Sequence, residues 1–173
     1  MSRYNIDSPD KYSQLYKESV NEPEVFWSEL ASNNFLWEAK WSKVLDWDFR
    51  NAKVSWFKDA KLNITINCID RHVKNHPDKT AIIFEPNNPN EEYKSYSYSE
   101  LLAEVCKMAN VLKSLGVKKG DRVCIYLPMI PELAFSVLAC ARIGAIHSVV
   151  FAGFSSNALA TRIDDCMSSI IIT

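Results

Sequence analysis

Hydrophobic residues from Leu62 onward follow two alternating patterns. Residues 122–127 (RVCIYL) and 145–151 (AIHSVVF) are apolar almost throughout, which is typical of strands buried on both faces, and residues 80–85 and 170–172 share this character. Between these runs, apolar residues recur at spacings of three and four, which predicts helices. The order strand, helix, strand, helix, strand, helix, strand predicts an α/β fold with a mostly parallel sheet flanked by helices.

Local signals mark the ends of the expected helices. Ser97 and Glu100 match a capping box at the start of a helix whose apolar face is Leu101, Val105, Met108, Leu112 and Leu115, and Gly116 follows as its cap. A second helix spans 131–143 and ends at Gly144, and Ser155 caps a third that runs to about Met167. Residues 93–98, before the first helix, predict an exposed strand.

The first 61 residues differ from the rest, because all five tryptophans lie there. Ser8-Pro9 and Pro23 predict the starts of two helices, and the irregularly spaced aromatics beyond them favour a strap that packs its rings on another surface. A carbohydrate or nucleic-acid platform is the alternative. We therefore expect an N-terminal helical and aromatic strap over 1–61 and a partial α/β subdomain over 62–173.

The chain stops at Thr173, inside or directly after its last apolar strand. A parallel sheet with no further strands and no covering element is incomplete, so we expect a fragment of a longer protein. Uncovered apolar surface would then favour self-association of the isolated chain.

Composition excludes several classes of protein. The 173 residues are 47% hydrophobic and 24% charged, as in an average globular domain. With 20 basic and 21 acidic side chains, no overall field favours nucleic acid or an anionic membrane. The first ten residues lack the pattern of a secretory signal, and the uncharged stretch 143–161 contains too many polar residues for a membrane span. Five cysteines without a C-x-x-C pair indicate reduced, buried thiols and a cytoplasmic protein.

Few residues suggest catalysis or metal binding. Four glycines in the whole chain do not form a phosphate-binding loop, and the segment Gly116 to Asp121 is best explained as a turn. His72 and His76 have helical spacing but no evident third ligand, so we expect no metal site. Asp70 is expected in a local ion pair, and His147 is expected to be a core histidine of a buried strand. We predict no catalytic residue.

The turn 151–155 (FAGFS) is the most informative local feature. It leaves a predicted parallel strand at its carboxyl end, where open α/β sheets bind ligands, and enters a helix. Small residues at this point permit close approach of a ligand to the backbone, but any tight strand-to-helix turn also favours them. Both interpretations stay open on spacing alone.

Five segments are similar to a known family. They are Trp56-Phe57 with Leu62-Asn63, 67–72 (NCIDRH), 120–123 (GDRV), 126–132 (YLPMIPE) and 139–155 (ACARIGAIHSVVFAGFS). Over nearly its whole length the chain resembles the N-terminal region of the AMP-forming acetyl-CoA synthetase family, of the acyl-adenylate-forming superfamily. One departure is Lys58-Asp59-Ala60, where the family usually has two glycines after Trp-Phe.

The resemblance implies a ligase that joins acetate to ATP as acetyl-adenylate, with Mg²⁺, and then transfers the acetyl group to coenzyme A. Phe151, Ala152 and Gly153 match positions that line the coenzyme A entrance in the family. The family's phosphate loop, acyl pocket and catalytic lysine would lie beyond Thr173, so the partners would be acetate, ATP, coenzyme A and the remainder of the chain. The isolated chain is expected to be inactive and to bind none of these cofactors tightly.

Two alternatives stay open. A propionate- or acetoacetate-CoA ligase would share this region, because the residues that select the acyl group lie elsewhere in the family. A noncatalytic α/β module that binds coenzyme A or another nucleotide would use the same sheet edge.

Overall fold

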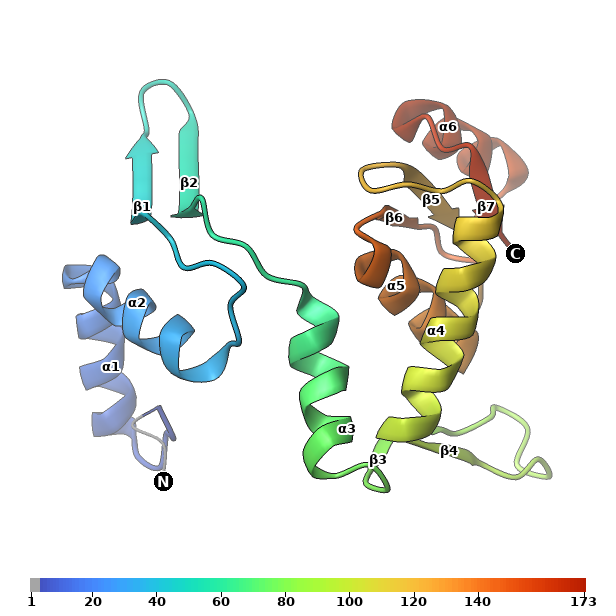
Figure 1. Ribbon diagram of the computed structural model, residues 1–173, viewed down its shortest axis with the longest axis horizontal. Coiled ribbons are helices and arrows are strands. Elements are labelled where there is room, and N and C mark those ends of the chain that lie inside the picture. The colour runs from blue at the N-terminus through green and yellow to red at the C-terminus, as the bar shows by residue number, and fades with distance from the viewer. Residues whose placement is uncertain (1–3) are drawn as a thin grey trace. The chain divides into compact units, whose positions relative to one another are not determined.

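The computed structural model describes residues 4–173, and the chain divides into two compact units, one ending at Leu62 and the other beginning at Asn63. The first unit contains two helices and a β-hairpin, and the second contains an antiparallel hairpin and a three-stranded parallel sheet with its helices (Figure 1). Within the described part of the chain, no helix is both long and apolar enough to cross a membrane.

The two helices of the first unit begin where the sequence predicts. Helix α1 (Pro9–Asn21) is capped by Ser8, whose side chain accepts a hydrogen bond from the Lys11 amide, and helix α2 (Pro23–Asn34) also begins with proline. Beyond them lies a β-hairpin that the sequence analysis did not predict within the aromatic-rich segment. Strands β1 (Lys43–Asp48) and β2 (Lys53–Lys58) pair antiparallel, because Asp48 bonds the amides of the turn between them and returns the chain on itself.

Several aromatic rings of this unit pack against one another. The centroids of Trp41 and Phe57 lie 4.8 Å apart, and Trp37 lies 5.1 Å from Trp41 and 5.5 Å from Phe57. The indole N–H of Trp37 donates to the carbonyl of Ala31 at 3.0 Å, so its polar end is satisfied while the ring packs. These contacts explain the clustering of Trp37, Trp41 and Phe57 by packing, whereas Trp47 is 62% exposed.

The segment that lacks the family's two glycines adopts a backbone that glycine would favour. Phe57 and Asp59 both have positive φ, 49° and 64°. A short polar side chain tolerates this region better than a bulky one, and the Asp59 carboxylate also accepts a hydrogen bond from the Ser42 hydroxyl. This chain therefore accommodates the positive φ of Asp59 without a glycine at residues 58–60.

The parallel sheet has the order β6-β5-β7. Strand β5 (Arg122–Ile125) is central and pairs in parallel with β6 (Ile146–Val149) on one side and β7 (Ile170–Ile172) on the other. Helix α5 (Pro131–Ile143) connects β5 to β6, and helix α6 (Ser156–Cys166), capped by Ser155, connects β6 to β7. This arrangement confirms the mostly parallel α/β fold.

The strand predicted at 80–85 lies outside this sheet. Strand β3 (Thr80–Phe84) pairs antiparallel with β4 (Lys94–Ser97), with a register shift between Thr80 and Ile82. The parallel pairing implied for it was wrong, because the connection between β3 and β4 is a short turn-rich loop and a parallel pair needs a crossover of a dozen or more residues.

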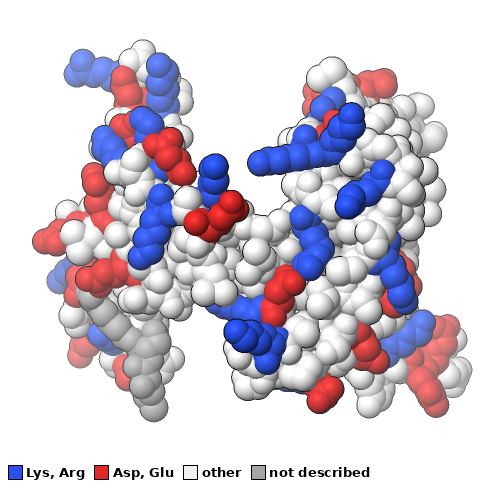
Figure 2. All heavy atoms as spheres, in the orientation of Figure 1, with Lys and Arg blue, Asp and Glu red and all other residues white. Residues whose placement is uncertain are grey.

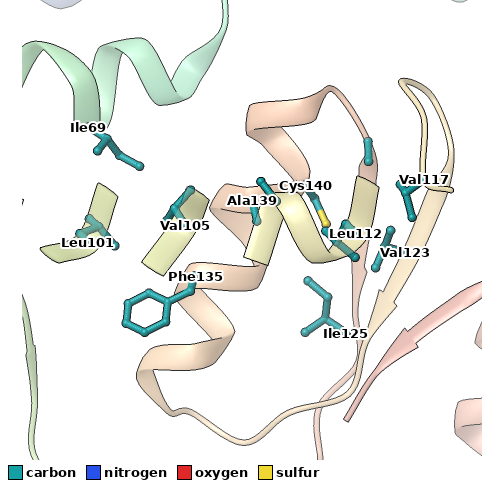
Figure 3. Close-up of a cluster of buried hydrophobic side chains, with 12 residues drawn as sticks. Ile69, Leu101, Val105, Leu112, Val117, Val123, Ile125, Phe135, Ala139 and Cys140 are labelled. Carbon is teal, nitrogen blue, oxygen red and sulfur yellow. The ribbon is translucent and has the colours of Figure 1, made fainter. Parts of the chain in front are cut away.

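A core of apolar side chains joins four parts of the second unit. Helix α4 (Tyr98–Ser114) and helix α5 pack together with β5, and Ile69 contributes from the preceding helical segment (Figure 3). Leu101, Val105 and Leu112 are buried as predicted, but Leu115 is 59% exposed because it follows the last residue of α4. The predicted capping box of Ser97 and Glu100 and the positive φ of Gly116 and Gly144 are confirmed.

A polar network fixes the N-terminal segment of the second unit to α5. A π-helical turn, η1 (Ile66–Asp70), leads into helix α3 (Arg71–Asn75). Asp70 accepts two hydrogen bonds from Arg142, at 2.9 and 3.0 Å, and Asn63 donates to the carbonyls of Ala141 and Arg142 at the end of α5. The predicted local ion pair was wrong, because the partner of Asp70 lies 72 residues away.

The ion pair of Asp70 and Arg142 should contribute measurably to the free energy of unfolding. Its hydrogen bonds raise the pKa of the Arg142 guanidinium, and both side chains are about two-thirds buried. We expect Asp70→Ala to lower the free energy of unfolding by about 1–2 kcal/mol, and a double-mutant cycle with Arg142→Ala to show coupling. Urea unfolding measures both. Lys107→Ala removes the exposed pair with Glu104 and should cost less than about 0.5 kcal/mol. Equal losses in the two variants would contradict this account.

Glu100 should make the stability of α4 depend on pH. The amide and hydroxyl of Ser97 donate to its carboxylate and lower its pKa from the ordinary value of 4.5. Since the folded-state pKa is depressed, this stabilisation is present above pH 4.5 and is lost as pH falls through the lower folded-state pKa. Unfolding measured between pH 3 and 6 should show a smaller acid-induced loss in Glu100→Gln than in the wild type. An unchanged profile in the variant would contradict the prediction.

Candidate functional site

The carboxyl edge of the parallel sheet brings two loops together. The chain leaves β5 into residues 126–130 and leaves β6 into residues 150–155. Because β5 and β6 run parallel and in register, both loops begin at the same edge (Figure 1). Ligands of open α/β sheets bind at this kind of edge, which makes it the candidate site.

The turn 151–155 is held at both ends. Val150 is buried, and its amide donates to the carbonyl of Ile125 in β5. The amide of Phe154 donates to the carbonyl of Phe151 at 3.0 Å and closes the turn, after which the Ser155 side chain caps α6. The predicted turn between strand and helix is thus present in the expected place.

Gly153 permits a close approach within this turn. A Cβ atom built on Gly153 would lie 2.5 Å from Cε1 of Phe151, well inside van der Waals contact. The Phe151 ring is itself 63% exposed, and it meets the Phe154 ring edge-on at 5.9 Å. The missing side chain of Gly153 therefore leaves space that an exposed aromatic ring partly fills.

A positively charged side chain, that of Arg162, lies beside the turn. The guanidinium carbon of Arg162, on α6, lies 4.5 Å from the centroid of the Phe154 ring, and its Nη1 donates to the carbonyl of Ala158. An aromatic surface with an adjacent guanidinium is suited to planar or anionic groups of a ligand.

Tyr126 belongs to the site, although the sequence analysis assigned it no role. Its hydroxyl lies 2.8 Å from the carbonyl oxygen of Ala152 and 2.9 Å from that of Phe154. The sequence could have indicated this contact, because Tyr126 stands at the carboxyl end of an otherwise apolar strand. A tyrosine ring that packs in such a place needs a hydrogen-bond partner for its hydroxyl.

The histidines lie outside this edge. The expectation of a core histidine at position 147 was wrong: His147 is exposed, because β6 pairs only with β5 among the described residues and lies at an edge of the sheet. His72 stacks on Tyr98 at 4.8 Å. Across residues 4–173, no group of three His, Cys, Asp or Glu side chains could hold a metal ion.

The cysteines are free thiols. Cys124 and Cys140 are buried, whereas Cys68, Cys106 and Cys166 are only half-buried, so the expectation that all five are buried was partly wrong. Burial raises the pKa of Cys140 to about 11, which keeps this thiol protonated at neutral pH. Cys140 is therefore unsuited to act as a nucleophile.

Substitution of Gly153 should move the neighbouring ring. In Gly153→Ala, the new methyl group and the Phe151 ring cannot both keep their places, and the exposed ring should rotate with little loss of stability. A crystal structure of the variant tests this. Ala152→Gly, which removes a methyl group from the same turn, should leave Phe151 in place. A Phe151 ring that stays where it is in Gly153→Ala would contradict the prediction.

Known proteins share this architecture and much of this sequence. Among solved structures, acetoacetyl-CoA synthetase from Streptomyces lividans superposes with a TM-score of 0.83 and 26% identity, over 92% of this chain and 24% of that one. The acetyl-coenzyme A synthetases of Magnetococcus marinus and Desulfatibacillum aliphaticivorans are 52% and 55% identical over 164 residues, which is 95% and 94% of this chain. The chain spans about a quarter of the length of these curated relatives.

Two family models cover consecutive parts of the chain. Residues 12–68 match the acetyl-coenzyme A synthetase N-terminus, and residues 69–173 match the AMP-binding enzyme family. The boundary between the matches lies in η1, just inside the second structural unit. Because the second match alone spans more than half of the 173 residues and includes the whole parallel sheet, the chain belongs to the AMP-binding enzyme family.

Proposed function

We propose that this chain is the N-terminal part of an AMP-forming acetate-CoA ligase. One observation carries the proposal: an acetyl-coenzyme A synthetase N-terminal segment and an AMP-binding segment match one after the other, and relatives about half identical over nearly the whole chain are named acetyl-coenzyme A synthetases. The full enzyme would convert acetate and ATP to acetyl-AMP and pyrophosphate. The thiol of coenzyme A would then displace AMP and form acetyl-CoA.

The proposed contribution of this chain concerns the second step. Thiol attack requires a channel that delivers the sulfur to the acyl carbon while water is excluded. We assign Phe151, Ala152 and Gly153 to the entrance for coenzyme A. Support comes from the small residues, the exposed ring and the neighbouring Arg162 at the carboxyl edge of the sheet. Coenzyme A would supply the nucleophilic thiol, and the turn would bind and orient its arm.

ATP and Mg²⁺ do not fit the residues present. The chain has four glycines and no glycine-rich phosphate loop, and the described residues hold no cluster suited to a metal ion. We propose that the remainder of the full-length enzyme binds both. The α/β subdomain would accordingly be incomplete within 62–173, and the isolated chain would be inactive.

Further proposals concern location and association. Both basic and acidic side chains occur on the face shown in Figure 2, and with 20 basic and 21 acidic residues in all, the charge supports a protein that binds no nucleic acid. The five free cysteines support a cytoplasmic location. Ile146, Val149 and Ile171, on the outer strands of the sheet, are about half exposed. Such surface supports self-association of the isolated chain.

A second candidate is an acetoacetate-CoA ligase. The structural similarity to an acetoacetyl-CoA synthetase favours it, but the sequence identity of that match is about half that of the acetyl-coenzyme A synthetases. Acetate is therefore the better-supported substrate.

Steady-state kinetics of the full-length protein tests the function. Acetate, ATP and coenzyme A should give acetyl-CoA, AMP and pyrophosphate in equal amounts. The kcat/KM for acetate should exceed that for propionate by about 10-fold or more, because one methylene in a small pocket is worth roughly that factor. Residues 1–173 alone serve as the control and should give no product. Preference for acetoacetate, formation of ADP, or activity of the isolated segment would contradict the proposal.

A further inference from the structure

The hydroxyl of Tyr126 connects the two loops of the candidate site. Tyr126 follows directly after β5, and its ring extends to the turn that follows β6, where the hydroxyl lies 2.8 Å from the carbonyl oxygen of Ala152 and 2.9 Å from that of Phe154. A phenol has one proton to donate, so the two carbonyls share it. These two carbonyls lie on either side of Gly153 in the sequence.

The backbone that carries the Tyr126 side chain is held in the sheet. The backbone amide of Tyr126 donates to the carbonyl of Ile172 in β7 at 2.8 Å, and the preceding residue, Ile125, is fully buried in the central strand. The side chain is half-buried, which limits the number of positions available to the hydroxyl. The Tyr126 side chain therefore holds the turn in a fixed position relative to the sheet.

The turn needs such a restraint because of its glycine. A residue without a Cβ explores a wide range of φ and ψ, and within the turn itself the bond between the Phe154 amide and the Phe151 carbonyl closes the chain around Gly153. The Tyr126 hydroxyl fixes the peptide units that follow Ala152 and Phe154. Without it, residues 152–154 could change conformation while β6 and α6 stay in place.

We propose that Tyr126 is a positioning residue for the thiol step: its hydroxyl holds the turn around Gly153 in the conformation that admits coenzyme A. This inference rests on the proposed function and extends it to a residue outside the entrance itself. Since the contact involves only the coenzyme A side of the reaction, loss of the hydroxyl should affect thiol transfer and not adenylate formation.

Tyr126→Phe in the full-length protein tests the inference, because it removes one oxygen atom and keeps the ring. We expect the KM for coenzyme A to rise about 3- to 10-fold, which corresponds to one ordinary hydrogen bond, with kcat and the KM for acetate unchanged. Acetate-dependent exchange of pyrophosphate into ATP, which reports the first step alone, should equal that of the wild type. Tyr93→Phe, at an exposed tyrosine before β4, is the matched control and should change none of these values.

Two results would overturn the inference. One is a wild-type KM for coenzyme A in Tyr126→Phe, and the other is an equal loss in pyrophosphate exchange, which would indicate general damage to the fold. Hydrogen exchange of the Phe154 amide, which donates to the Phe151 carbonyl, gives a reading independent of activity, and it should be faster in Tyr126→Phe than in Tyr93→Phe. A wild-type enzyme unable to use acetate and coenzyme A would refute the proposed function, while the exchange rates would still decide whether Tyr126 holds the turn.

Discussion

The parallel pairing of β5 with β6 and β7 is the constraint on which the second unit depends. Val123, Cys124 and Ile125 of β5 have no exposed surface, so this strand is enclosed by its two neighbours and by the core it shares with α4 and α5. Parallel neighbours require crossover connections, and the helices in those crossovers bury the faces of the strand. Helices α5 and α6 provide these crossovers, and the loops before them necessarily meet at one edge.

The candidate site follows from this arrangement. Tyr126 continues the central strand and Val150 continues its neighbour, so the phenol and the turn around Gly153 are brought together by strand register. The network of Asn63, Asp70 and Arg142 acts at the opposite end of α5, where it bonds the last carbonyls of the helix. Helix α5 is thus fixed to β5 through the core and to η1 through charged and polar contacts.

Local rules predicted the elements well, because their signals lie within a few residues of one another. The cap at Ser155, the capping box at Ser97 and the left-handed glycine at position 144 are such signals, and each is present. The errors concern tertiary partners. The pairing of β3, the exposure of His147 and the bond between Asp70 and Arg142 depend on which strand or helix lies alongside, which spacing along the chain does not encode. The hairpin β1–β2 was missed because its aromatics do not alternate regularly.

The place of the turn 151–155 after a strand made it a candidate, and only the family resemblance favoured a binding role for it, whereas the contact of Tyr126 with the turn was found only in three dimensions. The most direct test of the account is a crystal structure of the full-length protein with coenzyme A. We expect the pantetheine arm of coenzyme A to pass against the backbone of Ala152 and Gly153, with the Tyr126 hydroxyl still bonded to the turn. Coenzyme A bound elsewhere, without contact to residues 151–153, would contradict it.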